Sequence, residues 1–152
     1  MGSPACPPGM PTVGNTCPIK GAECEYGSNP NPACNQVFLC GSNSEWSLEN
    51  GGTCPTGTCP ATYSDVPQNM SCTPNGLDCS YSQGQCNCTM SLPIVNGATW
   101  KCFDPNGCPE PRPDLGSPCT GSQSCDYGAC NGGIEVECTD GYWKQEDVPC
   151  PG

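Results

Sequence analysis

Cysteine is the residue type in this sequence with the greatest capacity for chemistry, because a thiol can form a disulfide, bind a soft metal ion or act as a nucleophile. The 152 residues contain 18 cysteines in three sets of six. The sets are Cys6, Cys17, Cys24, Cys34, Cys40 and Cys54; Cys59, Cys72, Cys79, Cys86, Cys88 and Cys102; and Cys108, Cys119, Cys125, Cys130, Cys138 and Cys150. An even number at this density in a short chain predicts a disulfide framework.

The sequence contains few of the residues that other kinds of catalysis need. Histidine is absent, which excludes Ser-His-Asp and Cys-His catalysis and removes a common zinc ligand. Cys86 and Cys88 could bind a metal only if reduced, and a disulfide is expected instead. Paired carboxylates for glycoside hydrolysis need a sheltered site, which a chain poor in core residues is not expected to offer. We therefore expect no enzymatic activity and no cofactor.

Some carboxylates and asparagines are candidates for ion binding or modification. Glu135 and Glu137 alternate with apolar residues, so they project from one face of a predicted strand. Calcium is a candidate ligand either of this Glu135/Glu137 face or of the turn that begins at Asp104 (residues 104–107), the alternative being a solvated strand face and a solvated turn. Asn69 and Asn87 each begin an Asn-x-Ser/Thr sequence and are candidate glycosylation sites if the source is eukaryotic.

Composition makes the disulfides decisive for folding. Ile, Leu, Val and Phe supply only 16 of the 152 residues, whereas there are 20 Gly and 19 Pro. So small an apolar content is not expected to offset a chain entropy of roughly 1–2 kcal/mol per residue. Each disulfide contributes about 2–4 kcal/mol, mainly by restricting the unfolded chain. Because disulfides persist in oxidising compartments, the protein is predicted to be secreted, extracellular or displayed at a cell surface.

The chain is strongly acidic, with 4 basic residues, 15 carboxylates and a net charge of −11. Nucleic acid and anionic membrane surfaces are therefore not expected as partners. No stretch approaches the roughly 20 apolar residues of a membrane span, so no membrane insertion is expected. Residues 1–3 lack the basic and apolar regions of a signal peptide, which predicts that they are the start of a mature or recombinant form of the protein.

Three tandem repeats follow an N-terminal tail of residues 1–5, and we call them unit 1 (6–54), unit 2 (59–102) and unit 3 (108–150). Each unit opens with Cys-Pro, places Asn after its fourth cysteine, and has Gly or Asn three residues before its second cysteine, where a turn with positive φ is expected. Each unit also has a Cys-x-Tyr motif and one tryptophan. These repeat aromatics are Tyr26, Trp46, Tyr81, Trp100, Tyr127 and Trp143.

The predicted fold is small, disulfide-rich and mostly irregular, with one short β-hairpin in each unit. The hairpins are expected to pair residues 36–39 with 45–48, residues 92–95 with 98–100, and residues 134–137 with 142–144. The aromatics are expected to cover the disulfides as a miniature core. The alternative is an exposed row of rings that stacks on sugars or on a partner.

The spacers between units are short and rich in proline and glycine, and proline-rich segments stiffen a chain. They predict a linear array of units, a semi-rigid rod. Cys150-Pro151 repeats the opening Cys-Pro, which predicts that the chain was cut from a longer array or can be continued by another copy. Six cysteines allow 15 pairings in each unit. In unit 2, Cys88 follows Cys86 by only two positions, which predicts a local difference in connectivity.

Two resemblances accompany these motifs. The cysteine spacing of unit 2, with Cys86-Asn87-Cys88 between Cys79 and Cys102, resembles an EGF-like module. Over nearly the whole chain, the Cys-Pro, Gly-x-x-Cys, Cys-x-Tyr, Cys-Asn and terminal Trp pattern resembles the tandem six-cysteine repeats of secreted proteins and lipoproteins of predatory soil bacteria. That group has no agreed activity, so the resemblance implies location and architecture only.

The functional prediction is a non-enzymatic extracellular structural or adhesive protein that acts as a stalk, filament subunit or surface coat. The alternative is a disulfide-scaffolded binding module, such as a multi-headed protease inhibitor or a carbohydrate-binding array, with candidate loops at residues 27–33 and 41–44. A protein partner or self-association is expected, and carbohydrate is the alternative partner. A rigid scaffold favours binding because little loop ordering is needed.

Overall fold

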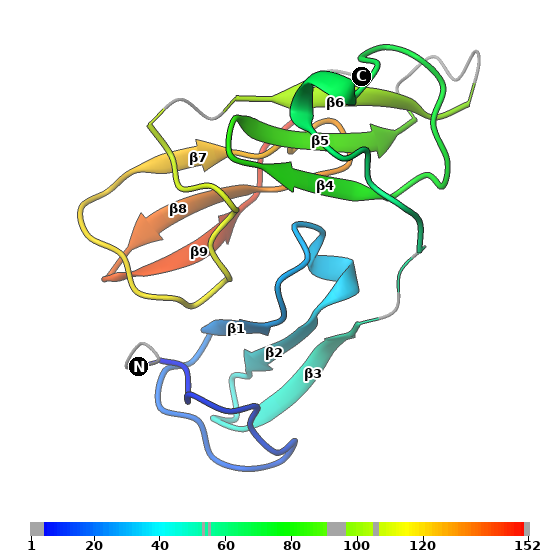
Figure 1. Ribbon diagram of the computed structural model, residues 1–152. Coiled ribbons are helices and arrows are strands. Elements are labelled where there is room, and N and C mark those ends of the chain that lie inside the picture. Colours follow the sequence, from blue (N-terminus) through cyan, green and yellow to red (C-terminus); the bar gives the residue numbers. More distant parts are fainter. Residues whose placement is uncertain (1–4, 53, 55, 91–96, 105–106, 151–152) are drawn as a thin grey trace.

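The computed structural model describes residues 5–52, 54, 56–90, 97–104 and 107–150, and these form three small antiparallel sheets (Figure 1). Unit 1 contains β1 (Glu23–Tyr26), the 3-10 helix η1 (Pro32–Cys34), β2 (Gln36–Cys40) and β3 (Trp46–Gly51). Unit 2 contains η2 (Tyr63–Asp65), β4 (Asp78–Tyr81) and β5 (Gly84–Thr89), and its last strand is β6 (Thr99–Phe103). Unit 3 contains β7 (Ser124–Asp126), β8 (Glu135–Thr139) and β9 (Tyr142–Glu146).

The predicted disulfide-rich fold with short hairpins in three repeats is confirmed. The hairpins expected in units 1 and 3 are β2–β3 and β8–β9. Asp140 and Gly141 join β8 to β9, and both have positive φ, at 58° and 87°. Two residues of this conformation make the turn whose twist matches that of the flanking strands, which explains the Asp-Gly sequence.

One expected hairpin strand of unit 2, residues 92–95, lies outside the described residues. Most of its expected partner, residues 98–100, belongs to β6, which pairs with β5. Each sheet also has a first strand that was not expected from the sequence, namely β1, β4 and β7, and each of these strands contains the third cysteine of its unit. These strands are only three or four residues long, too short to show a clear alternation of apolar and polar side chains.

All three units share one disulfide pattern, which joins the first cysteine to the third, the second to the fifth and the fourth to the sixth. The pairs are Cys6–Cys24, Cys17–Cys40 and Cys34–Cys54; Cys59–Cys79, Cys72–Cys88 and Cys86–Cys102; and Cys108–Cys125, Cys119–Cys138 and Cys130–Cys150. The predicted difference in connectivity at Cys86 and Cys88 is therefore wrong. Both cysteines project from the same face of β5, and each reaches its usual partner.

The recurring motifs make the same contacts in each unit. The tyrosine of each Cys-x-Tyr donates its hydroxyl to the carbonyl of the proline in the opening Cys-Pro, over 2.8, 2.7 and 2.5 Å in units 1, 2 and 3. Gly14, Asn69 and Gly116 all have positive φ and donate their N–H to the carbonyl of the tryptophan of their unit. The three tryptophans are buried, at 4–5 % exposure, in the apolar cluster of each sheet. They therefore lie in the core, as the packing interpretation expects.

The units close on one another instead of extending in a line. Figure 1 shows the three sheets grouped around a common centre. Val37 of unit 1 belongs to the apolar cluster of unit 3, and Tyr142 of unit 3 belongs to that of unit 1. Asn31 of unit 1 donates its side-chain N–H to the carbonyl of Gly76 in unit 2 over 2.8 Å. The linear rod expected from the spacers is thus corrected, because the proline-rich start of unit 3 packs against unit 1 instead of holding the units apart.

Candidate binding site at the junction of the units

A buried ion pair joins units 1 and 3. Glu25 occupies the middle position of Cys-x-Tyr on β1, and Arg112 lies in the proline-rich opening of unit 3. The guanidinium donates to both carboxylate oxygens, with Nη1–Oε1 at 2.9 Å and Nη2–Oε2 at 2.8 Å, and neither side chain has solvent-exposed surface. Such a bidentate arrangement combines charge with a fixed geometry.

The surrounding groups satisfy the remaining hydrogen bonds of this pair. Arg112 also donates to the carbonyls of Pro30 and Pro113, at 3.0 and 2.9 Å. Glu25 accepts the N–H of Leu115 at 3.0 Å and a side-chain N–H of Asn35. A buried ion pair is stable only when its partners compensate the lost hydration in this way. Asn35 is the asparagine after the fourth cysteine, so the Cys-Asn motif of unit 1 supports the junction.

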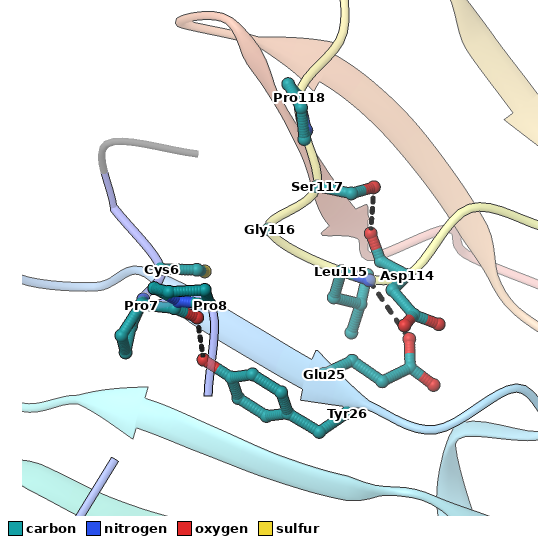
Figure 2. A pocket seen from close by; sticks show the side chains of 10 residues that line it. All are labelled: Cys6, Pro7, Pro8, Glu25, Tyr26, Asp114, Leu115, Gly116, Ser117 and Pro118. Carbon is teal, nitrogen blue, oxygen red and sulfur yellow. Dashed lines mark hydrogen bonds between the residues drawn. The ribbon is translucent and has the colours of Figure 1, made fainter. Parts of the chain in front are cut away.

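The same contact between units leaves an open cleft of about 290 Å³, which Figure 2 shows. Tyr26 and the Cys6–Pro8 segment form one side, and the loop of residues 114–118 forms the other. The complete lining consists of Cys6, Pro7, Pro8, Glu25, Tyr26, Asp114, Leu115, Gly116, Ser117 and Pro118. Hydrogen bonds within each side hold these walls, because Tyr26 donates to the Pro7 carbonyl and Ser117 donates to the Asp114 carbonyl.

Asp114 lines the cleft with a carboxyl group that is not part of an ion pair among the described residues. Its side chain extends beside the carboxylate of Glu25 (Figure 2), and among the described residues no donor forms a hydrogen bond with its carboxyl oxygens. Burial raises the pKa of Asp114 to about 6, and the negative charge of Glu25 acts in the same direction, whereas Arg112 opposes the rise. The cleft therefore has apolar walls and one carboxyl group without a partner.

A glycine in the cleft allows the close approach of the two units, and its replacement gives a testable effect. At Gly116, φ is +87°, and a Cβ atom would overlap Cys6 Sγ and the backbone oxygen of Glu23. Gly121 has a φ of +82° and open space around it, so it is a matched control for backbone strain. We expect Gly116→Ala to lower the free energy of unfolding by about 1–3 kcal/mol more than Gly121→Ala, because of the overlap. Denaturant unfolding without reductant measures this difference, and equal losses would contradict the packing described.

Unit 2 contributes a buried polar face to the junction. Asp78, Ser80, Gln85 and Asn87 lie opposite one another on β4 and β5 and share one face of the sheet. Asn87 donates to the carbonyls of Tyr127 and Asn131 in unit 3, at 3.1 and 3.2 Å. The second Cys-Asn motif therefore holds units 2 and 3 together. Because Asn87 has no exposed surface, the glycosylation predicted there is wrong for the folded protein, whereas Asn69 is exposed.

Buried acceptor oxygens without partners also occur on and beside this face. Both carboxyl oxygens of Asp78, Oε1 of Gln85 and Oε1 of Glu110 are buried and make no hydrogen bond among the described residues. Burial raises the pKa of Asp78 to about 7, with Arg112 opposing the rise. Burial also raises the pKa of Glu110 to about 7; the hydrogen bond from Ser80 opposes this rise, and the charge of Asp104 adds to it. Near neutral pH, protonation of these carboxyls avoids uncompensated buried charge.

A second cleft, of about 380 Å³, lies where all three units meet. Its lining is Ser28, Ser80, Tyr81, Ser82, Glu110 and Pro111. Ser28 comes from the predicted loop 27–33, part of which therefore lies at the junction. Residues 41–44, the other predicted loop, form the turn between β2 and β3, away from both clefts.

The candidate calcium ligands do not form a site. In the described ranges, no three His, Cys, Asp or Glu side chains come together as a metal-binding group. Glu135 and Glu137 lie on β8 opposite Glu146 and Lys144 of β9, and Asp104 follows β6. Burial, together with the charge of Glu146, raises the pKa of Glu135.

Sequence reasoning missed Glu25, Arg112 and Asp114. Their signal was weak, because Glu25 fills the variable position of Cys-x-Tyr and Arg112 is a single arginine between prolines.

Among the described residues, no helix has the length and apolar character of a membrane span. The nine disulfides fit an oxidising, extracellular environment. Comparisons of the chain with protein-family models, with curated proteins and with solved structures found no match.

Proposed function

We propose that the protein is a non-enzymatic, extracellular binding module whose three stapled units hold a preformed cleft between units 1 and 3. The closure of unit 3 onto unit 1 through the Glu25–Arg112 pair carries this proposal. Disulfides and buried hydrogen bonds fix the cleft walls before any ligand arrives. A preformed site avoids much of the entropy cost of ordering loops on binding.

The test is a search for ligands of the oxidised protein with a glycan array, a protease panel and a displayed peptide library. We expect a reproducible ligand whose binding is weakened by Gly116→Ala, which alters the cleft, but is preserved by Gly121→Ala. The absence of a ligand in all three searches, or equal binding by the two variants, would contradict the proposal.

A structural or adhesive role, as a filament subunit or surface coat, is the second candidate, although the closed arrangement no longer supports an extended stalk. The observation in its favour is a group of exposed apolar side chains in unit 1, namely Met10, Val13, Ile19 and Leu48. Exposed apolar surface can drive self-association. Sedimentation velocity over a range of concentrations tests this role, and a monomer at every concentration would count against it.

A further inference from the structure

We propose that the cleft between units 1 and 3 binds a basic side chain, arginine or lysine, of a protein partner, and that Asp114 is the residue that pairs with it. This inference rests on the proposed function, because it names the ligand class of that same cleft. Three observations support it: the unbalanced charge of the cleft, the apolar surface of its walls and the net negative charge of the whole protein.

The charge of the cleft is unbalanced by one negative unit. Glu25 and Asp114 are two carboxyl groups, and Arg112 is the cation that acts on both. The guanidinium of Arg112 already has hydrogen-bond partners, because it forms a buried bidentate pair with Glu25 and also donates to backbone carbonyls. Asp114 is therefore left with a carboxyl group that an incoming cation can pair with. A charged donor forms stronger hydrogen bonds with a carboxylate than a neutral one does.

The walls of the cleft suit the apolar methylene stem of a basic side chain. Pro7, Pro8 and Pro118 present apolar surface, and the ring of Tyr26 lies on the same side as Pro7 and Pro8. Long basic side chains bury their methylene stems against such surface while their charged ends reach a polar group. An aromatic ring near the cation adds a further attraction. The walls carry few hydroxyl groups, so the lining favours an amphipathic cation over a neutral sugar.

The net charge of the whole protein favours the same ligand. At −11, the chain attracts basic partners and raises the rate at which they encounter it. An anionic ligand would have to approach against this field and would find a second carboxylate, that of Glu25, beside Asp114. The ligand class is therefore a basic segment of a protein partner instead of a phosphate or an acidic peptide.

The experiment titrates the isotope-labelled, oxidised protein with acetyl-Gly-Arg-Gly-amide and follows backbone amide signals by NMR at pH 7 and low salt. The matched probe replaces arginine with citrulline, which has nearly the same shape without the charge. We expect shifts at Tyr26, Leu115 and Gly116 with the arginine peptide, and at least tenfold weaker binding of the citrulline peptide. The pKa of Asp114 is expected to fall from about 6 on binding, because a neighbouring cation favours the charged carboxylate.

Two variants of equal charge change identify the residue responsible. Asp114→Asn is expected to weaken binding of the arginine peptide about ten- to hundredfold, the effect of losing a charged hydrogen-bond partner. Asp65→Asn removes an exposed carboxylate in unit 2 and is expected to leave the affinity within about twofold. Because both variants carry the same net charge, the difference between them excludes a general effect of the acidic surface.

Several outcomes would overturn the inference. Equal affinity for the arginine and citrulline peptides would show that charge does not select the ligand, although the cleft would still be a binding site. Equal effects of Asp114→Asn and Asp65→Asn would show that Asp114 is not the partner. No shifts at the cleft with either peptide would also overturn it, and the proposed function would then depend on the separate ligand search.

Discussion

Replacing Arg112 with methionine is expected to lower the free energy of unfolding by about 3–5 kcal/mol and to separate units 1 and 3. The substitution preserves much of the side-chain length but removes the charge that faces Glu25. The carboxylate of Glu25 would then be buried without its counter-ion, and an uncompensated buried charge has a cost of this size. Guanidinium unfolding of the oxidised protein, followed by tryptophan fluorescence, measures the loss.

The controls for this prediction separate loss of charge from loss of the pair. Lys101→Met removes another cation, one that donates only to the Asn69 side chain among the described residues, and its effect is expected to stay within about 0.5 kcal/mol. Changing Arg112 to Met together with Glu25 to Leu removes both charges and is expected to recover part of the stability. A loss in Arg112→Met no greater than that in Lys101→Met would contradict the role assigned to the pair.

The second large effect concerns pH. Asp78 is 3 % exposed, and its pKa of about 7 in the folded protein lies above the ordinary value of 3.8. Between these two values the folded state holds a proton that the unfolded state has released, so stability falls as pH rises. Three pKa units correspond to roughly 4 kcal/mol, an upper limit for the stability that this group loses between pH 4 and pH 8.

Asp78→Asn removes this titration, so the variant is expected to be more stable than the natural protein at pH 8 and to gain nothing at pH 4. Unfolding free energies measured at several pH values give the two profiles. The variant loses only the part of the slope that comes from Asp78. The slope that remains comes from Glu23, Glu110 and Asp114, whose pKa values are raised, chiefly by burial, to about 8, 7 and 6. The exposed Asp65→Asn controls for loss of a surface charge, and parallel profiles for Asp78→Asn and the natural protein would contradict the prediction.

Local features of the fold could be predicted from the sequence because they depend on nearby residues. The Asp140-Gly141 turn needs two positive φ values, and these residue types tolerate them. The turns at Gly14, Asn69 and Gly116 follow from the same preference. The disulfide framework followed from the number and grouping of cysteines, although the pairing had to come from the structure.

The closed arrangement could not be predicted, because it depends on contacts between residues far apart in the chain. Glu25 and Arg112 are 87 positions apart, and Asn87 meets the Tyr127 carbonyl across 40 positions. Prolines near Arg112 were interpreted as a stiff spacer, but a rigid segment can also pack against a neighbouring unit. The candidate cleft was missed for the same reason, since its two walls come from units 1 and 3.

Small-angle X-ray scattering of the oxidised chain tests the closure of the three units most directly. A folded chain of 152 residues that forms one compact body is expected to have a radius of gyration of about 15 Å. The structure predicts this value and a distance distribution with a single, nearly symmetric maximum. A distinctly larger radius with the long tail of an elongated particle would show that the units lie in a line, and it would contradict the junction and the cleft described.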